Sequence, residues 1–178
     1  MPDLLLLNML RLSFLATLLV LLIAPATVQG QAFSDESLDA PEWQPFEEAM
    51  GQAAETEQTV MVDIYAEWCN WCRRLEEEVY ADTQVRNYLR ENFAVTRLDF
   101  DDSESEVTFQ NEPFAVPEMA YLLGAQGVPT VAFLSHEGEY ITHLPGFVER
   151  DDFLDVLRFV ATEAYKDQTW EEFVSVPE

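Results

Sequence analysis

The only two cysteines of this 178-residue chain are Cys69 and Cys72. They follow an apolar, β-branched run at residues 59–65, so we expect them to enter a helix directly after a strand, the arrangement of a redox dithiol. At a helix N-terminus the first sulfur faces unpaired backbone N–H groups and the positive end of the helix dipole, which stabilise a thiolate. Cys69 is therefore the expected nucleophile. Cys72 lies one turn further on the same face and is the expected resolving thiol, which attacks a mixed disulfide formed on Cys69.

Two other roles for the cysteine pair have weaker support. A structural disulfide that closes so small a ring removes little loop entropy and stabilises weakly. A zinc site needs about four ligands, and only His136 and His143 could join the cysteines. The spacing of these histidines misses the usual zinc-finger pattern, so we expect no metal.

The N-terminal residues are typical of a secretory signal peptide. Arg11 precedes the apolar stretch 12–24, and small residues follow at Ala26 and Gly30. We expect residues 1–30 to be a signal peptide, cleaved after Ala26 or Gly30, which implies a periplasmic or otherwise extracytoplasmic location. Counted from Leu4, the apolar run approaches the length of a membrane-spanning helix, so an uncleaved anchor is the alternative. No cysteine lies in this segment, which excludes a lipid-modified cysteine.

The composition predicts a folded protein with an acidic surface. The chain has 34 Asp and Glu against 9 Lys and Arg, a net charge of −25, and 48% hydrophobic residues. The negative electrostatic field of such a surface repels nucleic acid and anionic membranes. We therefore expect no nucleic-acid partner, and membrane contact only through an uncleaved leader. Three explanations stay open: adaptation to high salt, high solubility, or an acidic interaction surface.

The chain reads as one domain, residues 41–165, between a polar linker, residues 31–40, and a tail, residues 166–178. Apolar periodicity and turn residues predict an alternation of helices and strands without repeats. The expected elements are a helix that opens at Pro41 and Trp43 and runs to residue 55, a strand 59–65, helices 69–80 and 83–91, a strand 93–100, an acidic loop 101–112, a short helix 117–123, a strand 131–135, a strand 140–144, a helix 150–165 and one turn around Trp170 and Phe173 in the tail.

Several of these segments resemble the thioredoxin family. The run DIYAEWC at residues 63–69 is similar to the family's segment from strand to active site, Gly127-Val128-Pro129-Thr130 to its cis-proline loop, and Gly146 to the glycine before its last helix. The resemblance covers residues 60–161. Residues 63–85 most resemble the periplasmic C-terminal domain of the transmembrane thiol:disulfide interchange reductases and stand-alone secreted thioredoxin-like proteins.

The resemblance implies an α/β, thioredoxin-like fold: a central mixed β-sheet flanked by helices, with an N-terminal helix and an insertion, residues 102–118, before the cis-proline helix. The sequence departs from thioredoxin between the cysteines, where Asn70-Trp71 replaces Gly-Pro. That departure leaves the redox potential open, and the insertion leaves the partner open.

The resemblance also implies roles for residues around the cysteines. Asp63 matches a buried carboxylate beneath the second cysteine, where burial would raise its pKa and let it take the proton from Cys72 as a third catalytic group. A cis bond is expected before Pro129, which would place the Val128 backbone beside the cysteines to pair with an extended substrate. Arg97 takes the place of a family lysine near the carboxylate, although a solvated strand residue is an equal alternative.

Two tryptophans flank the nucleophile. Trp68 and Trp71 could form an apolar rim that binds a partner polypeptide. Trp71 also shares a predicted helical stripe with Leu75, so packing in the core is an equal alternative for it.

Together these observations predict a monomeric, extracytoplasmic thiol:disulfide oxidoreductase that reduces protein disulfides. Its partners would be protein thiols and disulfides and an upstream redox donor protein. No bound cofactor is expected, because the two thiols carry the electrons. The alternatives are an oxidase or isomerase of the same fold, and a chaperone-like module that binds peptides in the cis-proline groove.

Overall fold

The computed structural model describes residues 40–175. The expected leader, residues 1–30, most of the expected linker, residues 31–39, and residues 176–178 lie outside the described residues. No helix of the described part combines the length and the apolar content of a membrane-spanning segment.

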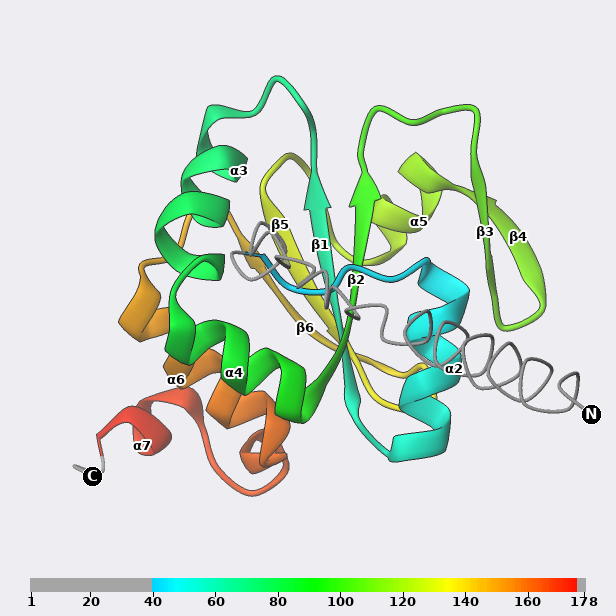
Figure 1. Ribbon diagram of the computed structural model, residues 1–178. Coiled ribbons are helices and arrows are strands. Elements are labelled where there is room, and N and C mark those ends of the chain that lie inside the picture. Colours follow the sequence, from blue (N-terminus) through cyan, green and yellow to red (C-terminus); the bar gives the residue numbers. More distant parts are fainter. Residues whose placement is uncertain (1–39, 176–178) are drawn as a thin grey trace, which may run out of the picture. The chain divides into compact units, whose positions relative to one another are not determined.

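Four strands form a mixed sheet in the order β2-β1-β5-β6 (Figure 1). β1 pairs in parallel with β2, and β5 runs antiparallel to both β1 and β6. The strands are β1 (Thr59–Tyr65), β2 (Phe93–Asp99), β5 (Thr130–Leu134) and β6 (Tyr140–Pro145). All four lie within one residue of their expected bounds, because each is an apolar run that ends at polar or turn residues.

Helices cover both faces of this sheet (Figure 1), which confirms the expected fold class. Even-numbered β1 residues such as Val62 pack under α2 and α5, and odd-numbered ones such as Met61 pack under η2, α4 and α6. The helices are α2 (Phe46–Thr56), α3 (Asn70–Leu75), η2 (Glu76–Tyr80), α4 (Thr83–Asn92), α5 (Val116–Leu122), α6 (Arg150–Ala161), η3 (Ala164–Lys166) and α7 (Trp170–Val174). Two separate apolar layers therefore sandwich the sheet.

The first helix begins later than expected. α2 starts at Phe46, and Pro45 is its N-cap. A residue before proline is pushed out of the helical region, so Gln44 stays extended. Gln44 pairs with β2 instead: its N–H donates to the Val95 carbonyl at 3.1 Å, and its carbonyl accepts from the Thr96 hydroxyl at 2.9 Å. The strap formed by residues 41–44 thus runs along the outer edge of the sheet.

The prediction of an irregular acidic loop at residues 101–112 is wrong in part. A hairpin forms there from β3 (Glu106–Phe109) and β4 (Glu112–Ala115), with positive φ at Gln110 and Asn111 in the turn. Val107 and Phe109 alternate with exposed residues and are 7% and 8% exposed. The hairpin is therefore a packed part of the domain.

Two expected helices also change character along their length. Residues 69–80 are split between α3 and the π-helix η2, where the Ala81 N–H donates to the Glu76 carbonyl at 2.9 Å. The expected helix 150–165 ends at Ala161, and Glu163 adopts a left-handed conformation before η3. The expected turn in the tail is confirmed as α7, where Trp170 packs against Phe159 with ring centroids 5.4 Å apart.

Candidate active site

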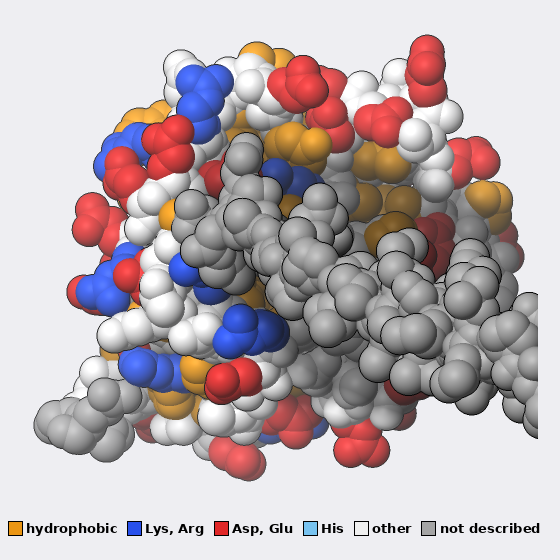
Figure 2. All heavy atoms as spheres, viewed as in Figure 1, with side chains coloured by type: hydrophobic (Ala, Val, Ile, Leu, Met, Phe, Trp, Pro, Cys, Tyr) orange, Lys and Arg blue, Asp and Glu red, His pale blue; other side chains and the backbone are white. Residues whose placement is uncertain are grey.

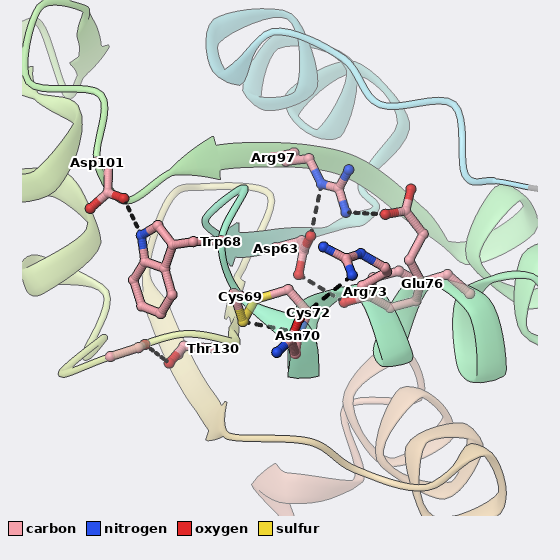
Figure 3. Close-up of a disulfide and its surroundings, with 12 residues drawn as sticks. Asp63, Trp68, Cys69, Asn70, Cys72, Arg73, Glu76, Arg97, Asp101 and Thr130 are labelled. Carbon is pink, nitrogen blue, oxygen red and sulfur yellow. Dashed lines mark hydrogen bonds and ion pairs between the residues drawn. A yellow bond between two sulfur atoms is a disulfide. The ribbon is translucent and has the colours of Figure 1, made fainter.

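The two cysteines lie where the loop after β1 enters α3. Cys69 is the N-cap residue of α3, and its Sγ accepts a hydrogen bond from the Cys72 backbone N–H at 3.0 Å. The two residues are joined in a disulfide (Figure 3) and are only 4% and 6% exposed. An N–H group aimed at the Cys69 sulfur also stabilises its thiolate once the disulfide is reduced. The geometry agrees with Cys69 as nucleophile, and this role stays a prediction.

The loop before β5 lies against the cysteines. The Val128–Pro129 peptide bond is cis, and Val128 packs on the small buried cluster that contains the disulfide. Thr130 and Gly146 secure this loop: the Thr130 hydroxyl donates to the Gly127 carbonyl at 2.8 Å, and the Gly146 N–H donates to the Pro129 carbonyl at 2.8 Å. Gly146 has a φ of +81°, which L side chains rarely adopt. Sequence-distant segments are thus brought together beside the disulfide.

Asp63 is buried in β1, on the face covered by η2, and is 1% exposed. Each oxygen of its carboxyl group has a donor. Arg97 Nε donates to Oδ2 at 2.9 Å from the adjacent position on β2 (Figure 3), and the Tyr80 hydroxyl donates to Oδ1 at 3.0 Å from the end of η2. The family-like place of Arg97 beside the carboxylate is confirmed, and the solvated alternative is wrong.

Arg97 is itself held between aromatic rings. Its guanidinium lies 4.3 Å from the centre of the Tyr65 ring and 4.7 Å from that of Trp43. Its Nη2 also lies 3.6 Å from a carboxylate oxygen of Glu76. Contacts with two aromatic rings and a second carboxylate restrict the guanidinium while it pairs with Asp63.

The charges at this cluster oppose one another. Burial raises the pKa of Asp63 above its usual value of 3.8, whereas the Arg97 charge and the hydrogen bonds from Arg97 and Tyr80 act to lower it. Burial and the nearby Asp63 charge raise the pKa of Tyr80 well above its usual 10.0. Tyr80 therefore stays protonated and acts as a donor at any physiological pH.

Both tryptophans beside the cysteines are exposed. Trp68 is 67% exposed, and its Nε1 donates a hydrogen bond to the carboxylate of Asp101 (Figure 3). Trp71 is 54% exposed and lies 5.7 Å from Phe147, with the Arg74 guanidinium 4.9 Å from the Trp71 ring centre. The core-packing alternative for Trp71 is therefore wrong, while contact of either side chain with a partner stays a prediction.

Sequence reasoning missed Tyr80 and Glu76 as neighbours of Asp63, and Trp43 as a neighbour of Arg97 and Tyr80. They come from η2 and from the strap before α2, and only the tertiary packing brings them together. The position of Glu76 one turn after Cys72 was the one available signal. Of the histidines, His143 pairs through Nδ1 with the Tyr140 hydroxyl. In residues 40–175 no group of three His, Cys, Asp or Glu side chains is arranged to hold a metal ion.

Comparison with known proteins identifies the domain. A family model described as a thioredoxin-like domain matches residues 46–161. The thiol:disulfide interchange protein DsbD of Photorhabdus laumondii is 29% identical over 118 residues, which are 65% of this chain and 18% of that protein. The thioredoxin-like protein HCF164 of Oryza sativa chloroplasts is 31% identical over 112 residues, 62% of this chain and 36% of that protein. The chain thus spans only about a fifth of the length of the DsbD relative.

Solved structures agree with this assignment. A thioredoxin from Thermus thermophilus, 27% identical, superposes with a TM-score of 0.55 over 70% of this chain and 89% of its own. A thioredoxin-fold protein from Helicobacter pylori superposes with a TM-score of 0.57 over 67% of this chain and 79% of its own, at 22% identity. The chain belongs to the thioredoxin-like domain family, with Cys69 and Cys72 as its Cys-x-x-Cys pair.

Proposed function

We propose that this protein is a monomeric, extracytoplasmic reductase of protein disulfides. The observation that carries the proposal is the placement of a Cys-x-x-Cys pair at the start of α3, between a cis-proline loop and a buried carboxylate. An upstream dithiol protein would supply the electrons. The leader pattern in residues 1–30 supports the location, and the similarity to thiol:disulfide interchange proteins supports the class of partner.

The proposed reaction has two steps. The Cys69 thiolate attacks a substrate disulfide, so that a Cys69–substrate bond forms, the substrate S–S bond breaks, and one substrate sulfur leaves as a thiolate that is protonated from water. Cys72 then gives its proton to the Asp63 carboxylate and attacks Cys69. This step forms the Cys69–Cys72 disulfide and releases the second substrate sulfur with the electron pair.

An extended segment of the substrate is proposed to bind at the cis-proline loop. A groove beside this loop is lined by Gly127, Val128, Pro129, His143 and Gly146. The Val128 backbone would pair with the substrate in strand fashion, since strand addition supplies affinity without demanding a sequence. Trp68 and Trp71 would cover the substrate on the other side of the disulfide.

The charges around α3 support the reducing direction. Strongly oxidising dithiols of this kind owe their potential to a stabilised reduced form, usually a thiolate held by positive charge. Here the Arg74 guanidinium is bound by Glu78 through two hydrogen bonds of 2.7 and 2.8 Å, and Arg97 is bound by Asp63. We therefore expect a potential nearer to about −270 mV than to about −120 mV when the full chain is equilibrated with glutathione.

Trapping of a mixed disulfide tests the proposal. Cys72→Ser, incubated in its reduced form with a disulfide-bonded protein such as insulin, should accumulate a mixed disulfide with that protein, because the resolving thiol is missing. Dithiothreitol should cleave this covalent complex by reduction. Cys69→Ser is the matched control and should trap nothing. Equal trapping by both variants would contradict the assigned roles. A parent protein that binds unfolded peptides but reduces no disulfide would instead support the chaperone-like alternative.

The expected location has its own test. The full chain, expressed in a bacterium with two membranes, should be recovered from the periplasm in a form shortened after Ala26 or Gly30. N-terminal sequencing of the recovered protein identifies the cleavage point. Recovery of the full-length chain with the membrane would support the uncleaved anchor, and recovery from the cytosol would contradict an extracytoplasmic role.

A further inference from the structure

The Tyr80 hydroxyl is a buried polar group that the mechanism above does not use. Tyr80 is fully buried, and its hydroxyl donates to Asp63 Oδ1 at 3.0 Å. Arg97 occupies the other oxygen, Oδ2, at 2.9 Å. The two donors approach the carboxyl group from different elements, η2 and β2, and together restrict its rotation. Each of them favours the carboxylate form, against the effect of burial.

The ring of Tyr80 has little freedom to move away from Asp63. It packs edge-on against Trp43 at 5.5 Å and against Phe153 at 5.7 Å. The backbone around it is a π-helix, and the wider turn buries Val79 and Tyr80 side by side. Single π-helical turns inside α-helices are frequent at functional sites. Here the turn directs a phenol hydroxyl at the carboxylate of β1.

We propose that Tyr80 is a positioning residue of the redox site: its hydroxyl holds the Asp63 carboxylate in the orientation and charge state from which Asp63 accepts the proton of Cys72. This inference rests on the proposed function, in which Asp63 takes that proton during release of the substrate. Tyr80 itself transfers no proton, because its phenol stays protonated throughout.

The charged groups around Asp63 set the direction of the effect. Arg97 faces it from β2, Glu76 from η2 and Tyr65 from the end of β1, and the cysteines lie at the start of α3. Arg97 and Tyr80 favour the carboxylate, and Glu76 disfavours it. Loss of the Tyr80 hydroxyl removes one of the two stabilising partners, so Asp63 should hold its proton up to a higher pH.

Tyr80→Phe is the test variant, because it removes the hydroxyl and keeps the ring between its aromatic neighbours. In the disulfide form, the Asp63 carboxyl titration, followed by NMR with 13C-labelled aspartate, should move up by about one pH unit. In the reduced form, the acid limb of the rate of substrate release should move up by the same amount. Tyr88→Phe, a half-buried tyrosine on α4, is the matched control and should move neither.

A second replacement gives the opposite sign and does not depend on how well Tyr80→Phe folds. Site-specific 3-fluorotyrosine at position 80 makes the hydroxyl a stronger donor. The midpoint of the Asp63 titration and that of the acid limb of substrate release should then both move to lower pH. An unchanged Asp63 titration in both variants overturns the proposal, as does a shifted titration without a shifted release profile. If the parent protein reduces no disulfide, the proposed function fails, while the titration still decides whether Tyr80 controls the charge of Asp63.

Discussion

Asp63 shows how a single residue acquires its properties from three separate elements. The resemblance to the thioredoxin family implied a buried carboxylate at this position, and its 1% exposure agrees. Its partners come from β2 and η2, and together they oppose the effect of burial on its charge. By contrast, Cys69 and Cys72 are almost equally buried, so the different roles proposed for them rest on the helix N-terminus and on Asp63 rather than on access to solvent.

Replacement of Asp63 should separate its chemical role from its structural one. In Asp63→Asn, attack of Cys69 on a disulfide should proceed, whereas release of the mixed disulfide should slow by about 10²-fold or more, because the amide cannot take the proton of Cys72. Stopped-flow measurement of both steps checks this. Asp99→Asn, at the end of the neighbouring strand, is the control and should leave release unchanged. Equal rates of release in Asp63→Asn and the parent would show that Asp63 accepts no proton.

Asp63 should also make the stability of the parent protein depend on pH, and Asp63→Asn is the reference that reveals this dependence. Because burial raises the pKa of Asp63, the folded protein binds a proton there more tightly than the unfolded chain does. The contribution of this group to stability is therefore full at pH values below about 3.8, the pKa of Asp63 in the unfolded chain. It is lost as the pH rises through the higher pKa of Asp63 in the folded protein. Relative to Asp63→Asn, the parent should gain free energy of unfolding as the pH falls from neutral, measured by urea titration. A constant difference would contradict the raised pKa.

At the scale of elements, the acidic insertion contains the hairpin β3–β4, whose buried side chains pack into the core of the domain. Phe109 packs edge-on against Phe46 of α2 at 6.0 Å, and the Thr108 N–H donates to the Glu47 carboxylate at 2.6 Å. Both contacts join the hairpin to α2. On the other side of the same segment, Asp101 accepts a hydrogen bond from Trp68 beside the disulfide. The segment from Asp101 to the hairpin therefore contacts both Trp68 beside the disulfide and α2.

Truncation of the hairpin's apolar side chain should reveal this packing. Phe109→Ala should lower the free energy of unfolding by about 3 kcal/mol, the usual cost of removing a buried phenylalanine ring. Thr108→Ala, one residue earlier and exposed, should cost less than about 0.5 kcal/mol. Urea unfolding followed by tryptophan fluorescence measures both. Similar midpoints for the two variants would show that the hairpin is not part of the core.

At the scale of the molecule, positive charge is confined to part of the fold. Residues 101–149 contain no Lys or Arg, whereas Arg73, Arg74, Arg86 and Arg90 lie on α3 and α4. On the face of the molecule drawn in Figure 2, Lys and Arg side chains (blue) lie on the side of α3 and α4, and Asp and Glu side chains (red) lie across most of the described surface. Much of the net charge of −25 therefore has no nearby cation to compensate it.

This distribution predicts that salt stabilises the protein. Raising potassium chloride from about 0.1 M to about 1 M shortens the Debye length from about 10 Å to about 3 Å and screens repulsion that is stronger in the folded chain than in the expanded one. The melting temperature should rise by about 3 °C or more, equivalent to about 1 kcal/mol. Sucrose at the same osmolality, which does not screen charge, is the control. A melting temperature that stays flat or falls in potassium chloride would remove the support for adaptation to salt.

The sequence alone determined the four strands of the mixed sheet, most of the helices, the cysteine pair at a helix start and the loop before Pro129, because these depend on local signals: apolar periodicity, caps and turn residues. Only the tertiary structure decided the rest. The hairpin was missed because its strands are only four residues long and its buried residues, Val107 and Phe109, follow an acidic run. The helix α2 began late because Pro45 moved Gln44 into pairing with β2. The contacts of Tyr80 with Asp63 and of Trp43 with Arg97 were missed because these residues come from distant parts of the chain, and non-local contacts leave no periodic trace in a single sequence.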